Sequence, residues 1–351
     1  MLIETEIIIW DEIFMASKVA FEAVDALLGD LMQNDNPFGG KLIVVGGDFR
    51  QTLPIVQHGG REKTLEACVC RSSLWPLFAK YRLTANMRAR DTGEDWQEFL
   101  LKVGNGEAND ADNRVMLPYR ICEGDIVTSV FGECIEPGSV YILAEKAILA
   151  PKNSHVQTIN TDTLRRLQVT NPRDGRVFKS VDEAILGDNV DQIHMLTEYL
   201  NCLTPSGMPP HELHLKRGSI VMLLRNLDVN NGLCNGTRVM VESLGRFLLG
   251  CRFISGQRRG QLTIIPRIDL YCDGAPFRLR RRQFPIRLAF AMTINKSQGQ
   301  TFSKIGLFLP EDVFNHGQIY TALSRVRKPD GILVNSNSHF VNNVVFSEVF
   351  A

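Results

Sequence analysis

Two adjacent carboxylates, Asp11 and Glu12, directly follow the apolar run at residues 7–10. At the end of a buried strand this pair suits phosphate chemistry. The Asp can hold Mg²⁺ beside nucleotide phosphates, and the Glu can orient or deprotonate the attacking water. The pattern also fits a buried strand that simply ends at a solvated acidic turn, so taken alone it is a weak motif.

A second polar cluster contains Gly47, Asp48 and Gln51, and it follows the apolar run at residues 42–45. Between the two runs, residues 19–32 carry apolar side chains at helical spacing, which predicts a strand, a helix and a parallel strand. Ligands bind beyond the carboxyl ends of such strands, so we expect both clusters on one rim. The Gln51 amide suits a sensor of the γ-phosphate. A plain turn that uses Gly for its conformational freedom is the alternative.

Three further segments hold residues suited to phosphate. Arg88 offers a permanent forked charge, and residues 295–301 are dense in small polar side chains after the apolar stretch at residues 288–294. Arg325 lies near the end of a predicted helix at residues 315–325, where it suits a charge that completes a nucleotide site. The first two have plain alternatives: Arg88 as a surface residue, and the small polar segment as a helix cap and loop.

A dense basic run covers residues 278–282 and includes Arg280 and Arg282. On a strand this run predicts either an edge that contacts phosphates or a solvated edge protected by charge. The whole chain gives no charge argument for nucleic acid, because its Lys and Arg residues together number 39, as do Asp and Glu.

The bulk composition fits an intracellular globular protein with two or three domains in its 351 residues. The eight cysteines contain no C-x-x-C pair, which indicates reduced thiols instead of a disulfide framework or a zinc site. No signal peptide and no segment long enough to span a bilayer is expected. A second α/β pattern begins at residue 147, and short β-rich runs between residues 215 and 282 predict a small barrel inserted into it.

Taken together, the motifs at residues 7–12, 47–54, 83–88, 284–301 and 317–325 resemble the PIF-type (petite integration frequency) DNA helicases, in particular the helicase portion of Helitron-like transposon proteins. The resemblance implies an α/β fold with two RecA-like domains and an inserted β-barrel. The first, incomplete domain with its linker would cover residues 1–118, the second residues 119–200 and 285–351, and the barrel residues 201–284.

The resemblance also implies the partners and the roles of single residues. It implies ATP, Mg²⁺, single-stranded DNA and duplex junctions as partners, no membrane, and 5′-to-3′ unwinding by a monomer. Asp11 would hold Mg²⁺, Glu12 would activate water, Gln51 would sense the γ-phosphate, and Arg88 and Arg325 would neutralise its charge. The remaining expected contacts are Gly47, Asp48, Gln298 and Gly299 for the nucleotide, and Thr293, Asn295, Lys296, Ser297, Arg280 and Arg282 for DNA.

The sequence departs from the family pattern in one respect: it contains no G-x-x-x-x-G-K-[ST] phosphate loop. We therefore expect impaired catalysis, unpaired strand edges and exposed apolar surface near residue 7. The alternatives are a non-catalytic remnant that binds single-stranded DNA and an incomplete gene model. The family expectation is a role in repair, recombination, telomere maintenance or transposon replication, in the nucleus or alternatively in mitochondria.

Overall fold

The computed structural model describes residues 2–56, 59–84, 93–117, 122, 124–136, 140–185, 196–273 and 277–350. The chain forms two compact units. The first comprises Met1–Ile121, Ser297–Thr301 and Leu309–Ala351, and the second comprises Cys122–Lys296 and Phe302–Phe308. The division into three domains that was expected from the sequence stays a prediction.

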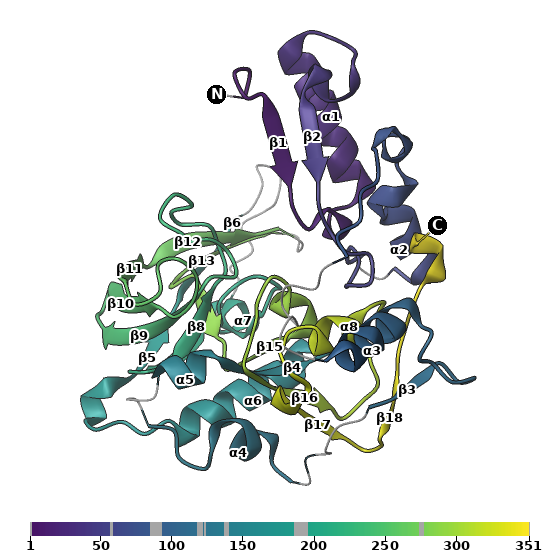
Figure 1. Ribbon diagram of the computed structural model, residues 1–351. Coiled ribbons are helices and arrows are strands. Elements are labelled where there is room, and N and C mark those ends of the chain that lie inside the picture. The colour runs from purple at the N-terminus through teal and green to yellow at the C-terminus, as the bar shows by residue number, and fades with distance from the viewer. Residues whose placement is uncertain are drawn as a thin grey trace. The chain divides into compact units, whose positions relative to one another are not determined.

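The first unit begins with the predicted strand, helix and parallel strand (Figure 1). Strand β1 (Ile7–Trp10) pairs in parallel with β2 (Leu42–Val45), with Ile7 opposite Leu42 and Trp10 opposite Val45. Helix α1 (Lys18–Met32) connects them. It begins where the Ser17 hydroxyl accepts a hydrogen bond from the backbone N–H of Ala20, as Ser does at helix N-termini.

The two faces of the β1–β2 pair differ sharply in burial. Alternation along the strands turns Ile8, Trp10, Ile43 and Val45 toward a core that contains Phe21 of α1. The other face exposes four aliphatic side chains, whose exposed fractions are 51% for Ile7, 75% for Ile9, 58% for Leu42 and 46% for Val44. Within the described part of the chain, β1 pairs only with β2, so the first unit carries both open strand edges and an apolar sheet face.

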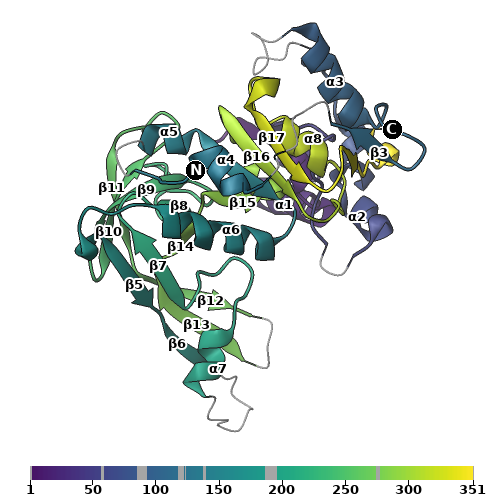
Figure 2. The ribbon, with the colours of Figure 1, turned by 90° about the horizontal axis from the view of Figure 1, so that it is seen from below.

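Later segments complete the first unit. Their bounds are α2 Arg61–Ala67, α3 Glu94–Asn105, β3 Arg114–Met116, α8 Gln318–Leu323, β17 Ile332–Ser336 and β18 Phe340–Asn342. Helices α3 and α8 lie side by side, as Figures 1 and 2 show, and β18 pairs antiparallel with β3. Helix α8 is shorter than the predicted helix at residues 315–325, because Gly317 before it has a left-handed backbone with φ 70°.

The second unit contains a small parallel sheet covered by helices. Strand β4 (Lys146–Ala150) pairs in parallel with β15 (Ala291–Thr293) and with β16 (Lys304–Leu309). The helices that contact β4 are α4 Ile126–Phe131, α5 Val140–Ala144 and α6 Asn153–Arg166, all labelled in Figure 1. Among the described helices, none combines the length and apolar character needed to cross a bilayer.

The β-rich part of the second unit holds three antiparallel sheets. One has the order β11 (Leu262–Pro266), β10 (Leu248–Phe253), β9 (Arg238–Leu244), β8 (Ile220–Leu223), β14 (Ile286–Leu288). The second has the order β12 (Ile268–Cys272), β13 (Arg278–Gln283), β6 (Val181–Ile185), and the third pairs β5 (Gly175–Lys179) with β7 (Glu212–Lys216). Helix α7 (Thr197–Cys202) contacts β6. In the described residues the first sheet ends at β11 and β14, and no pairing closes it into a barrel.

A buried ion pair ties β13 to β6. The Arg281 guanidinium donates to both carboxylate oxygens of Asp182, at 2.9 and 2.6 Å, and both side chains are 0% exposed. The guanidinium also donates to the carbonyls of Leu200, Leu203 and Pro209, so its donors are used within the fold. Such complete hydrogen bonding is what makes a buried charge pair tolerable.

We expect Asp182→Asn to destabilise the second unit by about 3 kcal/mol, because it leaves the Arg281 charge buried without a counter-ion. Urea unfolding followed by circular dichroism measures this loss. The matched control is Glu212→Gln, which breaks an exposed 3.1 Å pair with Lys179 and should cost less than about 1 kcal/mol. Equal losses in the two variants would contradict the prediction.

Candidate active site

The carboxyl ends of β1 and β2 lie against one another. The backbone N–H of Gly46 donates to the Trp10 carbonyl at 3.0 Å, and the Ile13 N–H donates to the Gly46 carbonyl at 2.9 Å. A Cβ atom on Gly46 would lie 3.2 Å from Oδ1 of Asp11. The structure therefore brings the Asp11 carboxylate next to the start of the Gly46–Asp48 segment.

Glu12 has a strained backbone. Its φ of 54° and ψ of 37° lie in the left-handed region, which a side chain with a Cβ disfavours by about 1–2 kcal/mol. Its N–H donates to Oδ1 of Asp11 at 2.9 Å, which helps to hold the turn. Strained residues of this kind are concentrated at functional sites, which makes the Glu12 position a candidate for a chemical role.

The loop at residues 47–52 folds back on Asp48. The Gln51 N–H donates to the Asp48 carbonyl, and the Arg50 N–H donates to Oδ1 of Asp48 at 3.1 Å. The Arg50 side chain donates to Oδ1 of Asn105 at 2.7 Å, which connects the loop to α3. These hydrogen bonds fix the backbone position from which the Gln51 side chain extends.

Segment 316–320 holds the same loop from the other side. The Tyr320 hydroxyl donates to Oδ2 of Asp48 at 2.6 Å, and burial, with the Asp48 charge, raises the pKa of Tyr320. A Cβ on Gly317 would lie 2.3 Å from the Arg50 carbonyl oxygen and 2.7 Å from the carbonyl of Gln51. Only glycine allows so close an approach, because it lacks the Cβ that would collide with the backbone.

His316 joins the loop to the C-terminal segment. Its Nδ1 accepts from the Phe346 N–H at 2.8 Å, so its Nε2 carries the proton and donates to the Phe49 carbonyl at 2.7 Å. Burial lowers the pKa of His316, while the Phe49 carbonyl and the charges of Asp48 and Glu348 partly oppose that shift. The His316 ring is therefore neutral in the folded chain.

The buried polar atoms of the first unit that have no hydrogen-bond partner among the described residues include Oε1 of Gln51, Oγ1 of Thr52, Oε1 of Gln298 and Oγ1 of Thr321. Gln298 and Thr52 are also joined directly, since the Gln298 amide donates to the Thr52 carbonyl at 3.4 Å. A buried polar atom without a partner costs about 1–3 kcal/mol, which a bound ligand or water would recover. The orphaned amide oxygens fit a site that takes up a polar molecule.

Arg325 is buried, at 1% exposure, and lies beside these groups. Its Nε donates to the Thr321 carbonyl at 2.9 Å, and its Nη2 donates to Oγ of Ser324 at 2.8 Å. Its charge acts on Tyr320, whose pKa it lowers against the larger effect of burial. The structure therefore fixes a positive charge near the loop at residues 47–52, whereas Arg88 lies outside the described residues.

The donor set fits Mg²⁺ held jointly with phosphate. No group of three or more His, Cys, Asp or Glu residues that could enclose a metal occurs in the described chain. Mg²⁺ does not need one, since it is commonly bound by one or two carboxylates together with substrate phosphates. Asp11, exposed at the strand end, is suited to that single-carboxylate role.

A basic cluster of the second unit surrounds Lys296. Burial lowers the pKa of Lys296, and so do the positive charges of Arg225 and Arg287. Mutual repulsion of three cations is relieved by an anion, so the cluster suits a phosphate. Sequence reasoning proposed Lys296 with Thr293 and Asn295 but did not assign Arg225 or Arg287, because only the fold shows that these arginines approach Lys296. Ser297, which was expected to contact DNA together with these residues, belongs to the first unit and is not counted in this cluster.

The two arginines proposed from the basic run have different surroundings. Arg280 donates to Oε2 of Glu183 at 2.8 Å and to Oδ2 of Asp269 at 3.2 Å, so carboxylates neutralise its charge. Arg282 is exposed and forms no ion pair with a described carboxylate.

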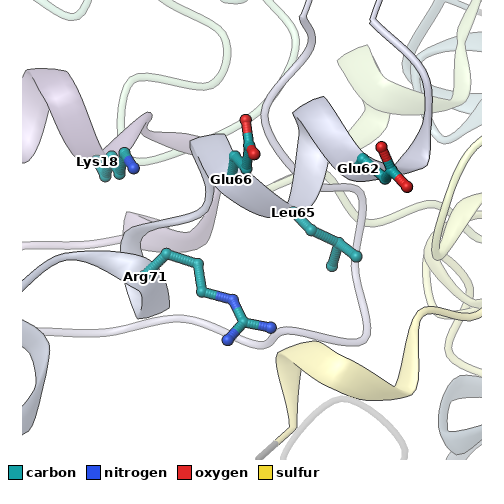
Figure 3. Close-up of a pocket in the computed structure, with 5 residues that line it drawn as sticks. All are labelled: Lys18, Glu62, Leu65, Glu66 and Arg71. Carbon is teal, nitrogen blue, oxygen red and sulfur yellow. The ribbon is translucent and has the colours of Figure 1, made fainter.

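A separate hollow of about 420 Å³ lies in the first unit (Figure 3). Its lining consists of Lys18, Glu62, Leu65, Glu66 and Arg71. Two acidic and two basic side chains balance one another there. The hollow therefore has no excess of positive charge that would favour phosphate.

Comparison with known proteins relates the chain to one family. The family described as PIF1-like helicase matches residues 1–114, and the DNA helicase Pif1 2B domain matches residues 198–244. The ATP-dependent DNA helicase PIF1 of Danio rerio is 29% identical over 93% of this chain and 46% of its own length. The Rattus norvegicus protein of the same name is 31% identical over 92% of this chain and 45% of its own length. The chain thus spans about half the length of these relatives.

Solved structures show the same fold. Pif1 helicase in a study of unwinding at forked duplex DNA matches with a TM-score of 0.70 at 24% identity, over 98% of this chain and 72% of that one. Pif1 helicase from Bacteroides, in complex with ADP-AlF3 and single-stranded DNA, matches with a TM-score of 0.69 at 23% identity, over 98% and 73%. The mixed α/β fold expected from sequence is confirmed.

We expect Gly317→Ala to destabilise the first unit by at least about 2 kcal/mol more than Gly299→Ala. Both glycines have a φ near 70°, so both variants are strained, but only the Cβ at position 317 meets backbone atoms. Urea unfolding followed by tryptophan fluorescence measures the difference, because Trp10, Trp75 and Trp96 all lie in the first unit. Equal losses would show that the close approach to Arg50 and Gln51 is absent.

The lowered pKa of His316 predicts a pH dependence of stability. The unfolded chain binds a proton to this ring at about pH 6.5 while the folded chain does not, so stability falls as the pH decreases below that value. The advantage of the wild type over His316→Gln in unfolding free energy should be constant above about pH 6.5 and shrink below it. The exposed His339 provides the control, and His339→Gln should leave the profile unchanged. A pH-independent advantage would contradict a neutral His316 ring in the folded chain.

Proposed function

We propose that this chain, which has the sequence and fold of a PIF1-like helicase, forms one part of an ATP-dependent DNA helicase. This part contains the carboxylate that holds the metal and the residues that sense the γ-phosphate. One observation carries the proposal. Segments as distant as residues 11, 51, 298 and 325 supply a carboxylate, orphaned amide oxygens and a buried guanidinium to one unit.

The residues divide the chemistry among them. Bound Mg²⁺ would neutralise phosphate charge as it develops. Asp11 holds the metal, and Glu12 takes the proton of the attacking water. The Gln51 amide contacts the γ-phosphate or that water, and Arg325 provides positive charge from beside α8. Gly47, Asp48, Gln298 and Gly299 shape the nucleotide site around them.

DNA is the second substrate in this proposal. Thr293, Asn295 and Lys296, now joined by Arg225 and Arg287, contact the phosphates of a single strand, and the chain moves on it from 5′ to 3′. Because the sequence holds no Gly-Lys-Thr phosphate loop, we propose that these 351 residues alone turn over ATP poorly.

A non-catalytic DNA-binding role is the second candidate. The same missing motif favours it, as does the basic cluster around Lys296, which does not require ATP to bind a phosphate. The two candidates predict different results when a phosphate loop is supplied. The helicase proposal predicts that ATP hydrolysis is restored, and the DNA-binding role predicts that it is not.

The test uses the chain alone and a version in which the phosphate-loop segment of a PIF1 relative precedes Met1. We expect background ATP hydrolysis from the chain alone, and from the fused version DNA-stimulated hydrolysis with unwinding of forks that carry a 5′ tail. Glu12→Gln in the fused version should lower kcat about 10²–10⁴-fold while ATP still binds.

Glu66→Gln in the mixed-charge hollow is the matched control and should retain full activity. DNA-stimulated turnover by the chain alone would refute impaired catalysis. A fused version that binds ATP and DNA but shows no DNA-stimulated hydrolysis would refute the helicase proposal in favour of the second candidate, and an active Glu12→Gln would remove Glu12 from the chemistry.

A further inference from the structure

Four arginines of the second unit gather from four places in the chain. Arg176 lies in β5, Arg246 in the turn between β9 and β10, Arg267 between β11 and β12, and Arg282 in β13. Burial lowers the pKa of Arg267 most, and the charges of the other three lower it further, so these three guanidiniums lie within electrostatic reach of Arg267.

Aromatic rings position the guanidiniums of Arg176 and Arg267. Arg267 lies over Phe284 at 5.1 Å and over Phe178 at 5.6 Å, and Arg176 lies over Phe178 at 5.1 Å. One amino group of Arg267 donates to the Lys179 carbonyl at 3.1 Å, while its buried Nε has no partner. The cluster therefore retains unused donor capacity at its centre.

No described carboxylate forms an ion pair with this cluster. Asp269, which lies opposite Arg282 in the sheet, accepts from Arg280 instead. Arg278 and Arg280 of the same strand are paired, with Asp273 at 3.2 Å and with Glu183 at 2.8 Å. Strand β13 thus contains two arginines that pair with described carboxylates, Arg278 and Arg280, and one that does not, Arg282. Positive charges gathered around Arg267 without an ion-pair partner among the described carboxylates repel it, and a bound polyanion removes that cost.

An exposed aromatic ring accompanies the arginines. Phe247 is 63% exposed, and the Arg246 guanidinium covers one part of it at 5.1 Å from the ring centre. A positive surface with an accessible ring suits an unpaired nucleic-acid strand, because its bases can stack on the ring while its phosphates meet the cations. A duplex keeps its bases stacked internally and cannot use the ring.

We propose that Arg176, Arg246, Arg267 and Arg282, together with Phe247, form a surface that binds one strand of DNA, with phosphates on the guanidiniums and a base on Phe247. The choice of DNA as the polyanion rests on the proposed function, whereas the surface itself rests on the geometry of the second unit. It is separate from the cluster around Lys296.

The test measures binding of a fluorescent oligothymidine to the full chain without nucleotide, by anisotropy over a range of salt. The triple variant Arg176→Gln, Arg246→Gln and Arg282→Gln leaves Arg267 in place, because that side chain packs on two rings. We expect at least about tenfold weaker binding at low salt and a salt slope smaller by about 2, since three phosphate contacts of a single strand are lost. Phe247→Ala should weaken binding about fivefold or more without changing the slope.

Two further variants make the outcome specific. Arg280→Gln removes one charge from the same strand but from a neutralised side chain, and should change affinity less than about twofold. The triple Lys variant at positions 176, 246 and 282 keeps the charges and should restore the salt slope. Unchanged circular dichroism confirms that each variant folds.

The proposal is overturned if the triple Gln variant binds as the wild type does, or if Arg280→Gln weakens binding as much as a Gln substitution at position 282. Duplex DNA that binds as tightly as the single strand, with no loss in Phe247→Ala, would overturn the stacking role. Because the measurement needs no ATP, its failure leaves the hydrolysis test of the proposed function standing, and failure of hydrolysis leaves this surface standing.

Discussion

The arrangement of the first unit depends on one close backbone approach. Gly317 comes so near to the Arg50 and Gln51 carbonyls that no side chain fits between them. Tyr320 and His316 then bond to Asp48 and to the Phe49 carbonyl on either side of this contact. Segments more than 260 residues apart are thereby fixed to one another, and the orientation of the loop after β2 follows from α8.

Around this contact the fold tolerates local costs that a purely structural core would avoid. Glu12 keeps a left-handed backbone, and Oε1 of both Gln51 and Gln298 is buried without a partner. The second unit does the same with cations around Lys296 and Arg267. Stabilisation from well-packed regions, such as the ring cluster of Phe21, Phe38 and Phe78, offsets these costs.

Sequence predicted local structure well because local structure follows from periodicity. The strands at residues 7–10 and 42–45 have the predicted bounds and the predicted parallel pairing. Partners distant in the chain were beyond such reasoning: an alternating basic strand does not reveal that Glu183 neutralises Arg280 while Arg282 stays uncompensated. The Tyr320–Asp48 bond was equally hidden, because neither residue type implies the other at a separation set only by topology.

The exposed aliphatic face of β1 and β2 has a consequence for the colloidal behaviour of this chain. Contiguous apolar surfaces on different molecules attract one another. The open edges of a two-stranded sheet also offer unpaired backbone groups for intermolecular strand pairing. Opposition to such attraction normally comes from net charge, which here is formally zero at neutral pH. Long-range electrostatic repulsion is thus weak near neutral pH, so little opposes association of molecules through this sheet face.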